Sequence, residues 1–187
     1  MQPNATKCNQ MQPNATKMQN QHKDIAQWHV ITGMNHSIER LKAANKDNTP
    51  LFSFNGLNTY GKAVDVYDGD TFNIIISHYD SVYHFKARMF GYDSPEMKPS
   101  LSLENREDIK KNAVLAKNRL TELLSSKEYF KVRCHEFDKY GRLLVSVMCD
   151  DDASSPSYDF ENTINAQMIK EGHGYAYNGG TKLKQHW

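Results

Sequence analysis

The sequence predicts an α+β protein whose main domain is a small five-stranded Greek-key β-barrel with two to three peripheral helices. Three observations support this prediction: apolar residues alternate between 61 and 92, helical periodicity runs through 104–125, and two further strand-like segments lie in 129–149. The chain of 187 residues is long enough for one hydrophobic core and an additional tail.

The first fifty residues are predicted to be a largely disordered N-terminal extension. The heptapeptide MQPNATK occurs twice, at 1–7 and 11–17, in a stretch rich in Gln, Asn and Met that has no apolar periodicity. Such a stretch has too few apolar residues to bury a core. We therefore place the folded domain at 51–178 and expect an irregular C-terminal tail at 179–187.

Three strands are expected in the first half of the folded domain. Residues 61–67 alternate and are followed by Asp68-Gly69, which is a strong hairpin turn signal. Segment 71–77 places three apolar side chains on one face, those of Phe72, Ile74 and Ile76. Segment 82–92 alternates again, and its period predicts that Arg88 points away from the core face.

Helical spacing distinguishes 104–125 from these strands. The apolar residues at that spacing are Ile109, Ala113, Ala116, Leu120 and Leu123. Segments 129–137 and 142–149 indicate another hairpin, and 163–171 indicates a second helix that ends at Gly172. Three strands, a helix, two strands and a helix match the five-stranded oligonucleotide-binding barrel (OB-fold) best.

Charge, cysteine content and hydropathy exclude several classes of protein. Residues 51–187 carry 17 Lys and Arg against 19 Asp and Glu, a net charge of −2, so the folded part is not a basic protein that coats nucleic acid nonspecifically. Its two cysteines, Cys134 and Cys149, form no zinc pattern and are expected to be inert thiols. Because the chain shows neither an apolar run of about 20 residues nor a signal peptide, we expect a soluble intracellular protein with no membrane partner.

An ordered set of charged motifs suggests the chemistry. The motifs are Asp68-Gly69-Asp70-Thr71, Arg88, Asp93-Ser94-Pro95-Glu96 and Asp138-Lys139-Tyr140-Gly141-Arg142. Their carboxylates suit a hard cation and the activation of water, and two guanidiniums suit a phosphate. Each motif alone is explained as a turn or a strand residue. Together, in this order, they indicate a metal-assisted phosphodiesterase.

These motifs, with Val66-Tyr67 before the first and with Asn165 and residues 168–172 in the second helix, make residues 59–177 resemble the staphylococcal-type nuclease (thermonuclease) family. The resemblance implies an OB-fold enzyme that uses Ca²⁺ to hydrolyse DNA, RNA or both. It further implies 3′-phosphate products and a preference for single strands. We expect a monomer.

The resemblance also implies a role for each site residue. The calcium ligands fall on Asp70, Asp93 and the backbone carbonyl of Ser94, with Asp68 as a supporting acid beside them. The catalytic residues fall on Arg88, Glu96 and Arg142, and Lys139 and Tyr140 lie near a substrate phosphate. Tyr175 and Tyr177 lie where the family offers a base-stacking tyrosine, and the register does not distinguish them.

A noncatalytic oligonucleotide- or protein-binding OB-fold module is the alternative. Members of this fold family that act as scaffolds tend to lose acidic or arginine site residues, whereas this chain has all of them. The sequence therefore favours the enzyme.

Overall fold

The computed structural model describes residues 34, 36–149 and 158–180. The chain divides into two compact units between Phe52 and Ser53. In the first unit, residues 36–43 are helical. The predicted disorder of the repeated heptapeptide lies outside the described residues, as does most of the predicted tail, so the predicted domain limits stay predictions.

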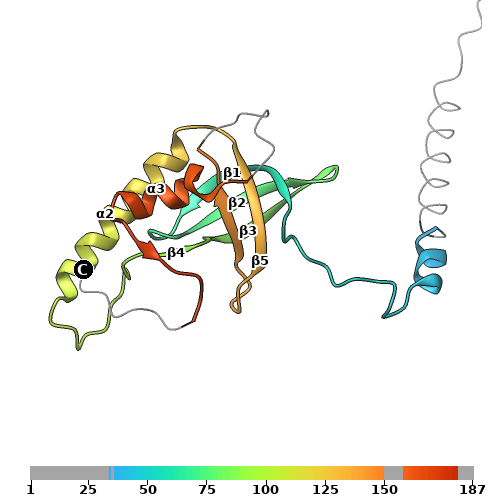
Figure 1. Cartoon of the computed structure of the whole chain (residues 1–187), viewed down its shortest axis with the longest axis horizontal. Helices are drawn as coiled ribbons and strands as arrows, with labels where there is room; N and C mark the ends of the chain where they lie inside the picture. The colour runs from blue at the N-terminus through green and yellow to red at the C-terminus, as the bar shows by residue number, and fades with distance from the viewer. Residues whose placement is uncertain (1–33, 35, 150–157, 181–187) are drawn as a thin grey trace, which may run out of the picture. The chain divides into compact units, whose positions relative to one another are not determined.

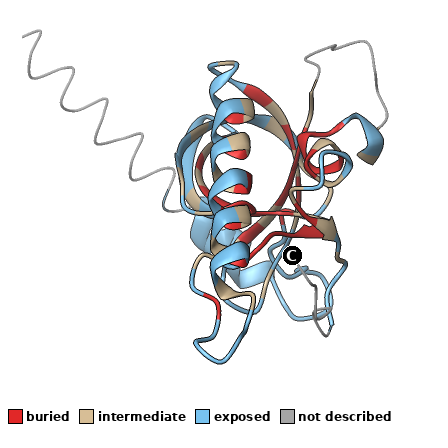
Figure 2. Ribbon diagram, turned by 90° about the vertical axis from the view of Figure 1, so that its left-hand side faces the viewer, coloured by how far each residue is buried: buried red, intermediate tan, exposed pale blue. Residues whose placement is uncertain are grey.

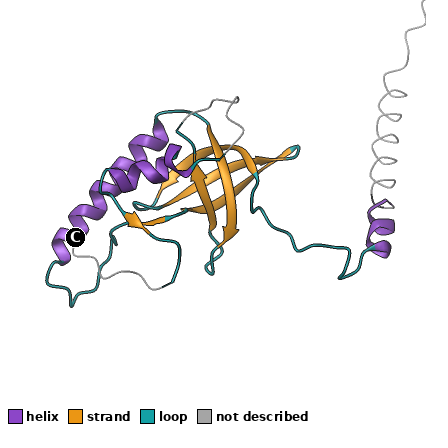
Figure 3. Ribbon diagram, in the orientation of Figure 1, coloured by secondary structure: helices purple, strands orange, loops and turns teal. Residues whose placement is uncertain are grey.

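The second unit contains a closed barrel of five strands (Figures 1 and 3). The strands are β1 (Asn58–Val66), β2 (Thr71–His78), β3 (Ser81–Met89), β5 (Phe130–Phe137) and β6 (Leu143–Val147). They are joined in the order β1-β2-β3-β6-β5, and β5 pairs with β1 to close the barrel. The β3–β6 pair is parallel and the others are antiparallel. This confirms the predicted α+β class and the five-stranded OB barrel.

The barrel core forms from the alternating side chains that the sequence pattern selected. Phe72, Ile74 and Ile76 of β2 are all buried, as are Ala87 and Met89 of β3. The intervening residues of β2 and β3 therefore face outward, and Thr71 pairs with Arg88 on that outer surface. This outer surface carries the site described below.

Two helices and a short 3₁₀ turn, η1 (Phe160–Asn162), pack around the barrel. Helix α2 (Arg106–Ser125) has its buried residues along one side, which is coloured red in Figure 2. The buried residues of the stripe are Ile109, Ala113, Ala116, Leu120 and Leu124. Leu124 is the last buried residue of the stripe, and Leu123, which was predicted at that position, is half-buried against the core.

Helix α3 (Ile164–Lys170) ends close to its predicted limits. The Thr163 side chain accepts a hydrogen bond from the Ala166 N–H at its N-terminus. Gly172 follows the helix with φ +76°, the left-handed conformation expected of a glycine that ends a helix.

A second, two-stranded sheet departs from the sequence prediction. Segment 82–92 is not one strand: the chain turns at Gly91, where φ is +87°, and continues as β4 (Tyr92–Asp93). Strand β4 pairs with β7 (Tyr175–Ala176), a strand in a region that shows no strand pattern. A two-residue strand is too short to have a readable period, so only the fold reveals it.

Both cysteines in the barrel unit are free thiols, as predicted. Cys134 lies opposite Val145 rather than opposite Cys149, and burial raises the pKa of its thiol to about 11. It is therefore protonated and unreactive at neutral pH. Within the part of the chain that the structure describes, no helix is both long and apolar enough to cross a membrane.

Candidate active site

The charged motifs meet in one cleft of about 970 Å³ on the outer surface of the barrel. The predicted residues that line it are Asp68, Asp70, Arg88, Ser94, Glu96, Lys139, Tyr140 and Arg142. Asp93 lies beside the cleft and contacts Arg88. The tertiary structure therefore brings all nine predicted site residues into one region.

The β1–β2 turn holds Asp70 in place through its own backbone. Asp68 Oδ1 accepts hydrogen bonds from the N–H groups of Asp70 (3.1 Å) and Thr71 (2.7 Å). A Cβ at Gly69 would lie 2.7 Å from Ala116 Cβ and 2.8 Å from Ser94 Cβ. Asp68-Gly69 was predicted as a hairpin turn signal. The φ of Gly69 is not positive, so the backbone conformation of the turn does not require a glycine here. The close approach of helix α2 and Ser94 does require one.

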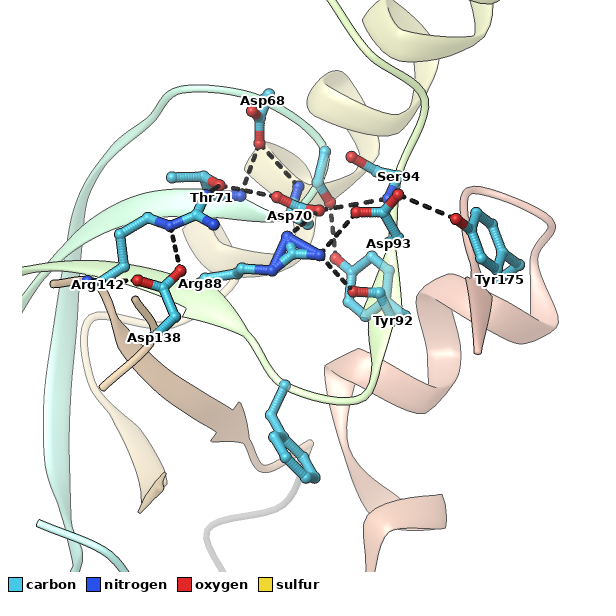
Figure 4. A network of polar contacts seen from close by, with 12 residues as sticks. Asp68, Asp70, Thr71, Arg88, Tyr92, Asp93, Ser94, Asp138, Arg142 and Tyr175 are labelled. Carbon is cyan, nitrogen blue, oxygen red and sulfur yellow. Dashed lines mark hydrogen bonds and ion pairs between the residues drawn. The ribbon is translucent and has the colours of Figure 1, made fainter. Parts of the chain in front are cut away.

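Arg88 joins the two aspartates among the three predicted metal ligands (Figure 4). Its Nη1 donates to Asp70 Oδ2 at 2.6 Å, and its Nη2 donates to Asp93 Oδ1 at 2.7 Å and to the Tyr92 carbonyl at 3.1 Å. Burial alone would lower the pKa of Arg88, but the two carboxylates outweigh it and raise that pKa. Arg88 points away from the barrel core as predicted, yet it is buried, and it contacts Tyr92 and Asp93 of β4.

The acids around Arg88 leave an excess of negative charge. Asp68, Asp70 and Asp93 carry three negative charges, and the guanidinium supplies one positive charge. Burial, with a smaller contribution from Asp68, raises the pKa of Asp70 despite the opposing attraction of Arg88. A cation at this position would stabilise the ionised form of Asp70.

The donor atoms suit a hard dication. Asp70, Asp93 and the Ser94 backbone are all buried, and all can offer oxygen. Across the described residues, no three His, Cys, Asp or Glu side chains gather in metal-binding geometry. Two carboxylates and one carbonyl therefore fit Ca²⁺ only if water and substrate oxygens complete its coordination, which Ca²⁺ tolerates well.

Arg142 is held at the other side of the cleft. Its Nε donates to Asp138 Oδ2 at 2.7 Å, and its Nη1 donates to Thr71 Oγ1 at 3.2 Å. Burial would raise the pKa of Asp138, but hydrogen bonds from Arg142 and from the Tyr140 N–H outweigh this effect and lower it. Thr71 Oγ1 in turn donates to Asp70 Oδ1 at 2.7 Å, so one chain of hydrogen bonds connects both arginines.

Three other predicted residues line the cleft with exposed side chains. Glu96 lies in the segment that follows β4, and Lys139 and Tyr140 lie in the β5–β6 turn. The Tyr140 ring centre is 5.5 Å from the Arg142 guanidinium carbon. These exposed groups are accessible to a ligand that enters from solvent.

A family model described as staphylococcal nuclease homologue matches residues 86–186, which is more than half of the chain. The chain belongs to the staphylococcal nuclease homologue family. The matched segment includes Arg88, the Asp93–Glu96 motif and the Asp138–Arg142 motif. A comparison with curated proteins found no match.

Membership in the staphylococcal nuclease homologue family indicates a nuclease, with nucleic acid as its class of substrate, in a family that is generally calcium-dependent. Strands β1 and β2 precede the matched segment, yet they complete the barrel of this family member. They also bring Asp68 and Asp70 to the matched residues.

In this nuclease homologue, several residues beyond the predicted set also support the site. Thr71 and Asp138 were within the motifs, and their hydrogen-bonding capacity beside Asp70 and Arg142 was a usable signal. Tyr175 donates from its hydroxyl to Asp93 Oδ2 at 3.2 Å. Tyr177 lines the cleft instead, with its ring centre 5.9 Å from the Arg88 guanidinium carbon. The β4–β7 pairing thus separates two tyrosines that the sequence could not distinguish.

Proposed function

We propose that this protein is a calcium-dependent nuclease that hydrolyses phosphodiester bonds of DNA, RNA or both, prefers single strands and leaves 3′-phosphates. The observation that carries the proposal is the continuous set of contacts from Asp93 through Arg88, Asp70 and Thr71 to Arg142. It supports a site with two buried acids at one end and two guanidiniums that face a common cleft.

The arginines are proposed to bind the scissile phosphate and stabilise the charge that grows on it. A guanidinium has five N–H donors. Arg142 uses two of them, at Nε and Nη1, and Arg88 uses three, at Nη1 and Nη2. The remaining donors of both side chains are available to phosphate oxygens, and such donors typically contribute about 10²–10³ in rate.

Glu96 is the proposed base that orients the attacking water and accepts its proton. Its side chain is exposed and lines the same cleft as both arginines, so a water molecule can approach it from solvent. Asp70, Asp93 and the Ser94 carbonyl are the proposed ligands of Ca²⁺. When bound, that ion would polarise the phosphate and lower the cost of its added charge.

The test is cleavage of labelled single-stranded DNA and RNA by the purified full chain, in Ca²⁺, in Mg²⁺ and in excess EGTA. Calcium-dependent cleavage with 3′-phosphate ends is expected. Glu96→Gln should lose about 10²-fold or more in kcat while keeping its circular dichroism spectrum. Glu104→Gln, which makes the same change at an exposed position outside the cleft, is the matched control.

Two results would count against the proposal. Wild-type turnover by a folded Glu96→Gln protein would remove the role of Glu96. Binding of oligonucleotides that depends on salt but not on metal, with no cleavage under any condition, would replace the enzyme with a noncatalytic binding module.

A further inference from the structure

Four cationic side chains of the described part of the chain line the cleft, and one of them has no part in the site described so far. These side chains are Lys86, Arg88, Lys139 and Arg142. The two arginines are paired with carboxylates. Neither lysine has an acidic partner among the described residues. The resemblance to the family implies that Lys139 lies near a substrate phosphate, so Lys86 is the cation without an assigned role.

Lys86 lies on the same outer face of β3 as Arg88. Between them, Ala87 is fully buried in the barrel core, whereas the Lys86 side chain is exposed. Residues two apart on a strand are separated by roughly 6.6 Å. This separation is close to the distance between neighbouring phosphates of an extended single strand. A strand whose scissile phosphate lies at Arg88 can therefore place its next phosphate at Lys86.

The net charge of the cleft indicates that Lys86 contributes to the attraction of substrate. Among the described residues, five carboxylates lie in or beside the cleft, on Asp68, Asp70, Asp93, Glu96 and Asp138, against four cations. These side chains sum to a charge of −1, and the proposed Ca²⁺ would bring the sum only to +1, so the cleft has little net charge with which to attract an anionic strand. An unpaired ammonium group at its edge supplies attraction where the paired guanidiniums supply less.

We propose that Lys86 forms a separate subsite for the phosphate next to the scissile one, distinct from the subsite of Lys139. The inference rests on the proposed nuclease function. It implies that the affinity for substrate increases with strand length because β3 contacts a further phosphate, independently of base identity. Removal of Lys86 should raise KM for substrates that have this second phosphate and leave kcat nearly unchanged.

The experiment uses dinucleotides with one internal phosphodiester and with no terminal phosphate, a 5′-phosphate or a 3′-phosphate. Each terminal phosphate should raise wild-type kcat/KM about tenfold. Lys86→Ala should lose the increase from one end, and Lys139→Ala should lose the increase from the other. Lys111→Ala, which removes an exposed lysine of α2 outside the cleft, should keep both increases.

Loss of neither increase in Lys86→Ala would overturn the inference. Loss of the same end in Lys86→Ala and Lys139→Ala would also overturn it, because the two lysines would then share one phosphate. An equal loss on the dinucleotide without terminal phosphates would place Lys86 at the scissile phosphate instead.

A binding measurement separates this inference from the nuclease proposal. Fluorescence anisotropy of a labelled single-stranded oligonucleotide would be measured over a range of salt, in Ca²⁺, with Glu96→Gln protein. Adding Lys86→Ala should reduce the slope of log K against log salt by about 0.7. A wild-type protein that binds without cleaving would refute the nuclease and leave this test valid. An unchanged slope would refute the Lys86 subsite.

Discussion

The Tyr175 hydroxyl donates a hydrogen bond to Asp93 Oδ2 across the β4–β7 pair, at 3.2 Å. The other oxygen of the same carboxylate accepts from Arg88. Asp93 is thus held on both sides, from the barrel by Arg88 and from the C-terminal segment by Tyr175. The segment after α3 therefore takes part in positioning a proposed metal ligand.

Tyr175→Phe is predicted to weaken Ca²⁺ binding about tenfold, because loss of a partner that orients a metal ligand typically has an effect of this size. Isothermal titration calorimetry with Ca²⁺ would measure it. Tyr129→Phe removes a comparable hydroxyl bond to an exposed carboxylate, that of Glu128, away from the cleft and serves as the control. Equal affinities in the two variants would show that Tyr175 does not position Asp93.

Gly69→Ala is predicted to destabilise the protein by about 1–3 kcal/mol, because the new methyl group would overlap Ala116 and Ser94. Urea unfolding would give the free energy. Gly141→Ala is the comparison: its φ is +78° but nothing lies within 4 Å of the added carbon, so only the backbone cost of about 1 kcal/mol applies. A smaller loss at Gly69 than at Gly141 would contradict the packing argument.

Asp138→Asn is predicted to reduce kcat about 10- to 100-fold with little change in Ca²⁺ affinity. Asn cannot supply the negative charge that fixes Arg142, whereas the proposed calcium ligands lie elsewhere, in the β1–β2 turn and in and just after β4. Steady-state kinetics on a single-stranded oligonucleotide, with calcium titrations in parallel, would separate the two effects. Asp65→Asn, at an exposed position of β1, should match the wild type in both. A parallel loss of calcium affinity would show that Asp138 supports the whole site.

The stability of the protein is predicted to decrease as the pH falls from about 6.5 to about 4. The ring of His135 stacks on that of Phe90, with the ring centres 3.9 Å apart. Burial lowers the pKa of His135 from 6.5 to about 4, and the positive charge of Arg133 adds to this effect. The unfolded state therefore binds the proton first, so stability is fully present above pH 6.5 and declines toward pH 4. Because the ring is only partly buried, the expected loss is about 1–2 kcal/mol.

Unfolding free energies of wild type and His135→Gln between pH 4 and 7 would test this prediction. The His135→Gln protein should have a flatter profile over that interval, even if its stability is lower throughout. Profiles that run parallel would show that other groups cause the acid sensitivity.

Much of the fold followed from local patterns. The two-residue period of β2 predicted its buried side chains, because alternation is a property of one strand and needs no partner. The four-residue step from Leu120 to Leu124 was missed, since the exact contact of a helix end depends on the surface it meets. Strand β7 was missed because two residues carry no period.

The candidate site was likewise predictable from the sequence only in part. By itself the sequence determined which chemical groups are present, their order along the chain, and the family that this order resembles. Only the tertiary structure decided which groups meet: Arg88 with both Asp70 and Asp93, Thr71 with Arg142, and Tyr175 rather than Tyr177 with Asp93. The physical reason is that a hydrogen bond requires partners within about 3 Å, and strand register and close backbone packing bring residues far apart in sequence to that distance.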